Sequence, residues 1–386
     1  MLKDWARAIP TAYRFLIYYN LLHICKAKIP AVSFPEYYSR KKRMLLSVLP
    51  SVAVVILNWN GRSFLEKFLP SVCRSTYKNM QLYVADNAST DDSVEYVRSH
   101  FPEVNIILNA TNDGFAGGYN TALQQVKADI YVLLNQDVEV EPGWIEPVIA
   151  QMMRDHHIAA CQPKLRAYYD KKQFEYAGAA GGWMDILGYT FCRGRILYRT
   201  EEDNGQYDDA QDIFWATGAA LFIRSSCFHE VGGFDADFFA HMEEVDLCWR
   251  LKRAGYRISY CPESVVYHVG GGSLPQGNPR KVYLNFRNNL MMLWKNLHPA
   301  DRWIVLSQRF FLDVLAAVKS LAAGKPADMK AIYMAYRHYY RWRKTYDPSR
   351  QKLPEKKLLE LTGVFHGIMI WRYYFLNRKT FRTLER

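Results

Sequence analysis

Cysteine is scarce in this sequence and is never closely paired. Seven cysteines are scattered over 386 residues, and no two of them form a C-x-x-C pair. Disulfide frameworks of small secreted domains and structural zinc sites both need paired cysteines. The sequence therefore argues against both classes and predicts a protein of a reducing compartment, the cytoplasm.

Long apolar runs are also missing. Near the N-terminus an apolar run extends only from Phe15 to Cys25 and is interrupted by Asn20 and His23, whereas a membrane-spanning helix needs about 20 apolar residues. A second candidate, residues 303–323, carries three charged side chains. We expect no secretory signal and no transmembrane helix. Residues 1–50 are expected to form an amphipathic helix followed by a basic connector.

Negative charge is rare in the C-terminal third. Residues 270–386 hold 22 Lys and Arg against seven Asp and Glu, whereas the first 269 residues hold 28 against 31. The C-terminal stretch is also rich in aromatic residues and predicts helices, among them 303–321 and 364–376. A basic, aromatic surface suits an anionic membrane. No RNA-binding motif accompanies it, so nucleic acid is not expected. The alternatives are that these helices pack on the rest of the chain or form an oligomer interface.

β-Branched segments alternate with helical ones from residue 51 onward, which is typical of βαβ units and a mostly parallel sheet. Ligands of such sheets bind at the carboxyl ends of the strands. Each of the four predicted strands ends in amides or carboxylates: Asn58 and Asn60, Asp86 and Asn87, Asn109 and Asn112, and Asn135 and Asp137. One such ending forms a turn, but four on one edge predict a polar pocket.

A glycine-rich segment, DGFAGGYN at residues 113–120, precedes a predicted helix. Backbone N–H groups at such a place can approach a phosphate, although glycines before a helix often form only a turn. The segment matches neither G-x-G-x-x-G nor G-x-x-x-x-G-K-[ST], which argues against a dinucleotide dehydrogenase and a P-loop kinase.

Two further residues suit a hard divalent cation. Asp137 is an oxygen donor of the kind that bridges such a cation to a substrate phosphate. His268 ends a predicted strand and is either a second ligand or a structural histidine.

Three acidic residues crowd the start of a predicted helix in HMEEVDLCWR, residues 241–250. Asp246 and Arg250 are four residues apart and can pair across one helical turn, which predicts a structural role for Asp246. Glu243 and Glu244 have no such local partner. Crowded carboxylates have raised pKa values, which suits a general base. Alternatively they form an exposed acidic helix start favoured by the helix dipole.

Seven motifs in order resemble the family 2 glycosyltransferases of the GT-A fold, in particular the bacterial branch of rhamnosyl- and galactofuranosyltransferases. These motifs are VVILNWNG, VADNASTDDS, NDGFAGGYN, LLNQDVEVEPGW, ATGAALFIR, GGFDADFFAHMEEVDLCWRLKRAGY and VYHVGGGS. The resemblance implies an α/β, Rossmann-like, mostly parallel sheet with flanking helices over residues 51–297. It leaves residues 298–386 as a helical C-terminal region.

Candidate roles follow from this resemblance. Asn135-Gln136-Asp137 occupies the family's D-x-D position, with Asn135 in place of the first acid. Asp137 and His268 would hold the divalent cation, Mg²⁺ or Mn²⁺. The nucleotide would be bound by Asn58, Asn60, Asp86, Gly117, Gly118, Asn120 and Asn135.

The remaining roles concern catalysis and the acceptor. Glu244 falls where the family places its catalytic base, with Glu243 beside it, and the pair is Glu-Glu where the family usually has Glu-Asp. Thr217 and Gly218 would lie near the acceptor.

The resemblance implies an inverting transferase that moves a sugar from a nucleoside-diphosphate sugar, with a rhamnose-like or other hexose donor, to a glycan or lipid-linked acceptor. Cell-surface polysaccharide assembly on the inner face of the cell membrane is the expected setting, with the protein bound peripherally. The alternatives are a catalytically weak nucleotide- or glycan-binding relic of the same fold and a sugar nucleotidyltransferase.

Overall fold

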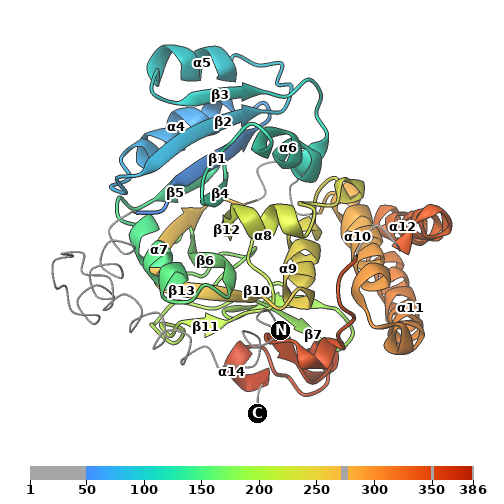
Figure 1. Ribbon diagram of the computed structural model, residues 1–386. Coiled ribbons are helices and arrows are strands. Elements are labelled where there is room, and N and C mark those ends of the chain that lie inside the picture. Colours follow the sequence, from blue (N-terminus) through green and yellow to red (C-terminus); the bar gives the residue numbers. More distant parts are fainter. Residues whose placement is uncertain (1–48, 271–276, 349–351, 385–386) are drawn as a thin grey trace, which may run out of the picture. The chain divides into compact units, whose positions relative to one another are not determined.

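The β-branched segments of the N-terminal half form parallel strands in the computed structural model of the chain (Figure 1). They are β1 (Val52–Asn58), β2 (Met80–Asp86), β3 (Asn105–Leu108) and β4 (Ile130–Asn135), in the order β4-β1-β2-β3. Asn58 pairs in register with Asp86, and Leu57 with Asn135. The polar strand ends therefore lie along one edge, as the sequence predicts.

The structure describes residues 49–270, 277–348 and 352–384. The amphipathic helix expected in residues 1–50 lies outside the described residues, apart from the last two positions of that range. The described residues from Pro50 onward belong to one compact unit.

Both faces of the parallel strands are buried, which explains their nearly continuous apolar sequence. In β1, Val54 and Ile56 face one core, whereas Ala53 and Val55 face the other. The first core is covered by α4 (Arg62–Cys73) and α7 (Ile145–Arg154), and the second by α6 (Gly114–Leu123). The remaining helix of this half is α5 (Ser93–His100).

The sheet continues beyond β4 with strands of mixed direction. Its order is β11-β13-β6-β12-β4, and β5 pairs with β13. The strands are β5 (Val138–Val140), β6 (Ile158–Ala167), β11 (Gln211–Asp212), β12 (Ala220–Arg224) and β13 (Arg257–His268).

The strand β13 differs from the sequence pattern, in which YRISYCP (residues 256–262) and SVVYHV (residues 264–269) each predict a short strand. The two segments form one strand, and a shift of register between Cys261 and Val265 accommodates Pro262.

A second, smaller sheet is built from the segment 182–200 and the end of the chain. Its strands are β7 (Gly182–Asp185), β8 (Thr190–Cys192), β9 (Arg195–Ile196), β10 (Arg199–Thr200) and β14 (Val364–Phe365). The last of these runs parallel to β7. Phe381 of α14 (Phe381–Leu384) then packs against the ring of Trp183.

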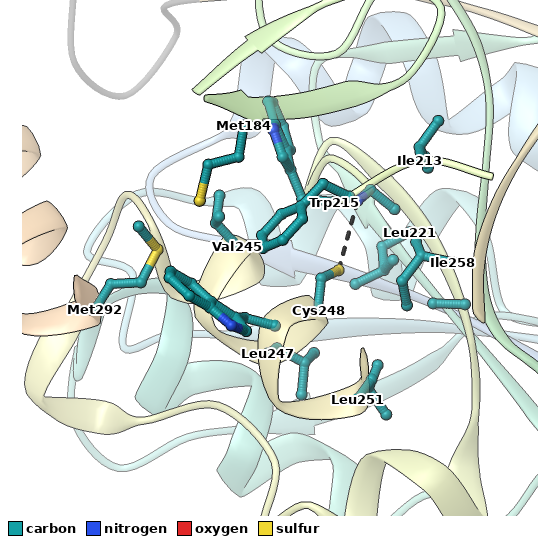
Figure 2. Close-up of a cluster of buried hydrophobic side chains, with 14 of the residues drawn as sticks. Met184, Ile213, Trp215, Leu221, Val245, Leu247, Cys248, Leu251, Ile258 and Met292 are labelled. Atoms are coloured by element: carbon teal, nitrogen blue, oxygen red, sulfur yellow. Dashed lines mark hydrogen bonds between the residues drawn. The ribbon is translucent and has the colours of Figure 1, made fainter. Parts of the chain in front are cut away.

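The helix α9 (Glu243–Arg253) is anchored by a buried apolar face. Figure 2 shows Val245, Leu247 and Cys248 of this helix among side chains from the strands and from α10, and each of the three is at most 2% exposed. The Sγ of Cys248 also accepts the N–H of Ala216. This packing fixes the start of α9, where Glu243 and Glu244 lie. The short elements before it are α8 (Ser225–Glu230) and the 3-10 turn η1 (Ala236–Phe238).

The C-terminal region contains three long helices, each begun by a proline in its first turn, where a missing N–H costs nothing. They are α10 (Pro279–Asn296), α11 (Pro299–Ala322) and α12 (Pro326–Thr345). The helix expected over residues 364–376 is only α13 (Met369–Tyr374), because the chain before it forms β14 and a glycine-containing turn. None of the helices in the described ranges has the length and hydropathy that crossing a bilayer requires.

Candidate active site

A cavity of about 460 Å³ opens at the carboxyl edge of the strands. Seven of the predicted site residues line it: Asn135, Asp137, Thr217, Gly218, Glu243, Glu244 and His268. They come from β4 and the turn after it, from the loop before β12, from α9 and from β13. Fold topology thus brings together residues that are up to 133 positions apart in sequence.

Asp137, His268 and Glu175 form a buried acid–imidazole–acid chain. The Nε2 of His268 is 3.2 Å from Oδ1 of Asp137, and its Nδ1 is 3.3 Å from Oε1 of Glu175. Burial alone would lower the pKa of His268, but the two carboxylates raise it to about 10. Burial raises the pKa of Asp137, yet the imidazolium outweighs burial and holds that pKa below its usual range. Positive charge is therefore strongly favoured at this point of the cavity.

Glu243 and Glu244 meet the cavity without compensating partners. The Oε2 atom of each is buried and has no hydrogen-bond partner among the described residues. Burial raises the pKa of Glu244 to about 7. Burial, together with the charge of Glu244, raises the pKa of Glu243 well above its ordinary value. Glu244 can therefore gain and lose a proton near neutral pH, and the neutral form of Glu243 is favoured relative to that of an exposed carboxyl group.

The loop before α9 is strained and was missed by the sequence analysis. Phe239, His241 and Met242 adopt φ values of 62°, 70° and 72°, a region that non-glycine residues rarely occupy. Such strain persists where surrounding structure imposes it, and it clusters at functional sites. Phe239 and His241 both line the cavity.

His241 contributes a neutral ring to this loop. Burial, reinforced by Lys281, lowers the pKa of His241 to about 4, and its buried Nε2 has no hydrogen-bond partner among the described residues. The ring is therefore a hydrogen-bonding group available to a ligand. Its only sequence signal is its place directly before the Met-Glu-Glu segment.

The predicted residues Asn58, Asn60 and Asp86 are not among the residues that line the cavity. The Nδ2 of Asn58 donates to Asp86 Oδ1 at 2.8 Å, and the Oδ1 of Asn60 accepts from the N–H of Thr90 at 2.7 Å. This network fixes the loop that presents Trp59, and that side chain itself lines the cavity at 47% exposure.

The predicted residues Gly117, Gly118 and Asn120 also lie outside the cavity. A Cβ at Gly117 would come within 2.6 Å of Asp113, and one at Gly118 within 2.9 Å of Asn87, so both glycines permit close packing. The amide of Asn120 makes two hydrogen bonds to the backbone of Phe234. The part of the glycine-rich segment that lines the cavity is Gly114 and Phe115.

The residues predicted for the acceptor lie at a narrow point of the cavity. The N–H of Thr217 donates to Gln162 Oε1 at 3.0 Å. A Cβ at Gly218 would come within 2.8 Å of the ring of Phe115. A larger side chain at Gly218 would therefore displace that ring and change the shape of the cavity.

Two basic residues at the start of α10 complete the cavity, and the sequence analysis did not single them out. Arg280 lies over the ring of Phe239 at 5.4 Å, and Lys281 follows it in the first turn. The sequence signal for Arg280 and Lys281 is the basic excess of the C-terminal third, from which contact with an anionic membrane is expected. These two residues instead bring positive charge to the cavity.

Asp246 holds α9 to α10 rather than facing the cavity. It binds Arg250 at 2.8 Å, as the sequence predicts, and also Lys295 at 3.0 Å, and all three side chains are at most 3% exposed. We expect Asp246→Asn to destabilise the fold by about 3–5 kcal/mol, because buried Arg250 loses its carboxylate partner and buried Lys295 keeps only that of Asp235.

Thermal unfolding measures this effect. We expect the Tm of Asp246→Asn to fall by roughly 5–10 °C. Glu95→Gln, which removes an exposed partner of Arg98, should leave Tm nearly unchanged because surface ion pairs contribute little. Equal Tm values for the two variants would contradict the structural role of Asp246.

Comparisons with known proteins find sequences similar to this chain. Residues 53–229 match the family described as Glycosyl transferase family 2. The N-acetylglucosaminyl-diphospho-decaprenol L-rhamnosyltransferase of Mycobacterium tuberculosis is 29% identical over 241 residues, which cover 58% of this chain and 76% of that protein. The O-antigen chain rhamnosyltransferase WbaN of Salmonella anatum is 23% identical over 222 residues, covering 57% and 66% of the two chains.

A solved structure shares the fold. The crystal structure of GalNAc-T7 with UDP, GalNAc and Mn²⁺ superposes with a TM-score of 0.53 at 16% identity, covering 81% of this chain and 60% of that one. The expected α/β sheet with flanking helices is therefore confirmed as a GT-A fold. The family match over residues 53–229, together with the two relatives, supports a glycosyltransferase, as the sequence motifs predict.

Proposed function

We propose that the cavity binds a nucleoside-diphosphate sugar and transfers its sugar, with inversion, to a hydroxyl group of a glycan or lipid-linked acceptor. The observation that carries this proposal is the pairing, in one cavity, of a cation-favouring site at Asp137 and His268 with an uncompensated carboxylate at Glu244. Direct displacement of a diphosphate by a hydroxyl needs both features. The first stabilises the leaving diphosphate, and the second accepts the proton of the attacking hydroxyl.

The residues around Asp137 fit a divalent cation, Mg²⁺ or Mn²⁺. One carboxylate oxygen and one imidazole nitrogen lie 3.2 Å apart and face the same cavity. No cluster of three or more His, Cys, Asp or Glu suited to a metal occurs in the described ranges, so the diphosphate of the donor would complete the coordination. When bound, the cation would stabilise the charge that grows on the leaving diphosphate.

Glu175 supports this site from behind. Its carboxylate approaches the Nδ1 of His268, and its other oxygen accepts the N–H of Ala177. A carboxylate behind a metal-binding histidine fixes the orientation and tautomer of the ring. Glu175 is thus a positioning residue, and Arg280 and Lys281 supply further positive charge for the diphosphate.

Glu244 would take the proton from the acceptor hydroxyl as that hydroxyl attacks the sugar. Its pKa of about 7 lies close to the working pH, which is the value at which a general base is most effective. Displacement in a single step inverts the anomeric carbon and needs no covalent intermediate.

The relatives and the surface of the protein support a proposal for the donor, the acceptor and the cellular location. Both rhamnosyltransferases named above support a rhamnose-like donor, and the mycobacterial one is named for a diphospho-decaprenol acceptor. We propose that the chain acts in cell-surface polysaccharide assembly at the inner face of the cell membrane, to which it binds peripherally.

A donor screen tests the proposed reaction. Purified protein with Mn²⁺ or Mg²⁺ is incubated with a panel of UDP-, dTDP- and GDP-sugars, and release of nucleoside diphosphate is followed. We expect metal-dependent release from one donor, accelerated by a lipid-linked glycan acceptor. If no donor is turned over and no nucleotide raises Tm, the protein is a binding relic of the fold and the proposal fails.

A further inference from the structure

The outward face of α11 is largely apolar, and Ser307 is an exposed polar residue within it. Its exposed side chains include Trp303, Ile304, Phe311, Val314, Leu315 and Val318, each 42–64% exposed. At about 100° per residue these six fall within an arc of roughly 120°. The opposite face, with Val305, Arg309 and Asp313, is buried against the rest of the protein. A contiguous apolar surface of this kind marks an interaction site.

A basic face lies beside this apolar one. Between Lys330 and Lys344 the exposed positions of α12 recur every three or four residues, and they are Lys330, Tyr333, Arg337, Tyr340, Arg341 and Lys344. The two helices pack side by side, with the rings of Phe310 and Tyr336 5.5 Å apart. Trp303 and Phe310 of α11 share one groove with Tyr340 of α12. The apolar face, the groove and the basic face therefore adjoin, and we call them together the α11–α12 surface.

The apolar part extends onto the end of the chain. Lys319 of α11 donates to the hydroxyl of Tyr374 of α13 at 3.2 Å. Next to this contact, Phe375 and Leu376 are 69% and 52% exposed. The residues directly after α13 therefore add two large apolar side chains beside the C-terminal end of α11.

We propose that the α11–α12 surface is the face by which the protein docks on an anionic bilayer, with α11 and α13 in the acyl–headgroup boundary and α12 against the headgroups. Apolar and aromatic side chains bordered by Lys and Arg are the features of a helix that lies in a membrane interface. A second copy of the chain is disfavoured as the partner, because symmetric pairing places the basic α12 faces of the two copies near each other.

This inference deepens the proposed function. It rests on that function in one respect only, the lipid-linked nature of the acceptor. Arg280 and Lys281 of the catalytic cavity lie in the first turn of α10, and Tyr283 one turn later contacts His338 of α12. The docking surface and the cavity are therefore linked through one rigid helix. Docking would hold the cavity close to acceptors anchored in the same bilayer.

Vesicle co-sedimentation of the full chain tests the inference. We expect strong binding to phosphatidylcholine vesicles that contain about a third phosphatidylglycerol, and weak binding to phosphatidylcholine alone. Raising the salt from about 0.1 M to about 0.5 M should weaken binding by screening the basic face. The double variant Phe311→Ser/Leu315→Ser should bind at least about tenfold more weakly, because two apolar side chains are lost from the interface.

Controls separate this inference from the proposed function. Tyr169→Ser removes a side chain that is 78% exposed outside this surface and should leave vesicle binding unchanged. Release of nucleoside diphosphate from a soluble donor should be the same in the double variant and the wild type. Unchanged vesicle binding by the double variant overturns the inference. A wild-type dimer that becomes monomeric in the double variant, without vesicle binding, also overturns it and identifies a second copy as the partner.

Discussion

Glu244→Gln is expected to lower the rate of sugar transfer by about 10²–10⁴, the usual contribution of a general base. The substitution keeps the shape of the side chain and removes its capacity to accept the proton of the acceptor. Donor binding should stay close to the wild-type value, because the proposed diphosphate site consists of Asp137, His268 and the basic residues and does not include Glu244. The measurement is kcat for transfer, together with the Kd of the nucleoside diphosphate.

The pH profile gives an independent check on Glu244. Its pKa of about 7 lies above the ordinary value, so the base is protonated and inactive at lower pH. At saturating metal, the wild-type rate should therefore rise as pH increases through about 7. The residual rate of Glu244→Gln should lack this rise. A rise that persists in the variant would assign the titration to another group.

Glu243→Gln is the matched control for Glu244→Gln. Burial and the charge of Glu244 raise the pKa of Glu243 and favour its neutral form, so an amide should replace it with little effect on the rate. Both variants should be as stable as the wild type at pH 8, or more so. A protein loses folding stability as pH rises when folding raises the pKa of one of its carboxyl groups. Replacing that group with an amide removes this loss. A larger loss of rate in Glu243→Gln would exchange the roles of the two residues.

The sheet and its polar edge were predictable because they depend on local patterns. β-Branched runs that end in Asn or Asp specify parallel strands and the edge at which their ends meet, and β1, β2 and β4 follow that rule. Asp137 and His268 were predicted one by one from chemistry and resemblance. Their 3.2 Å separation depends on the antiparallel pairing of β5 with β13, which no local pattern specifies.

Other site residues could not be predicted from the sequence, because contacts between distant segments place them in the site. Glu175 lies in a segment without a motif and meets His268 only through the fold. The positive φ values at Phe239, His241 and Met242 are imposed from outside the loop, where the N–H of Phe115 donates to the carbonyl of Phe239 at 2.7 Å. Glycines at 117 and 118 looked like ligand-binding residues, although their small size serves close packing.

The inward face of the C-terminal helix α11 could not be predicted from the sequence either. Apolar residues occur on both faces of α11, so hydrophobic periodicity could not decide which face packs inward. The structure resolves this through Arg309, whose guanidinium donates to the carbonyl of Leu187 and lies over the ring of Tyr189. A charged residue marks the inward face, and the outward face is the more apolar one.

Asp137→Asn is expected to lower the transfer rate at least about a hundredfold at limiting metal, since it removes the carboxylate of the proposed two-residue metal site. An amide oxygen keeps the size of the side chain but carries no charge to hold the cation. Raising the Mn²⁺ concentration should recover part of the lost rate, whereas it should recover none in Glu244→Gln. The nucleotide-dependent affinity for Mn²⁺, measured by calorimetry, should fall in Asp137→Asn and stay unchanged in Glu244→Gln.

Glu139→Gln provides the matched control for Asp137→Asn. Glu139 lies two residues further along the chain, on β5, and its carboxylate pairs with Lys171 rather than with His268. The same change from acid to amide should leave Mn²⁺ affinity and rate near the wild-type values, because exposed ion pairs contribute little. If Asp137→Asn binds Mn²⁺ as tightly as Glu139→Gln does, Asp137 is not a metal ligand. Its role would then be limited to holding His268 in its charged form, and the leaving diphosphate would depend on that imidazolium with Arg280 and Lys281.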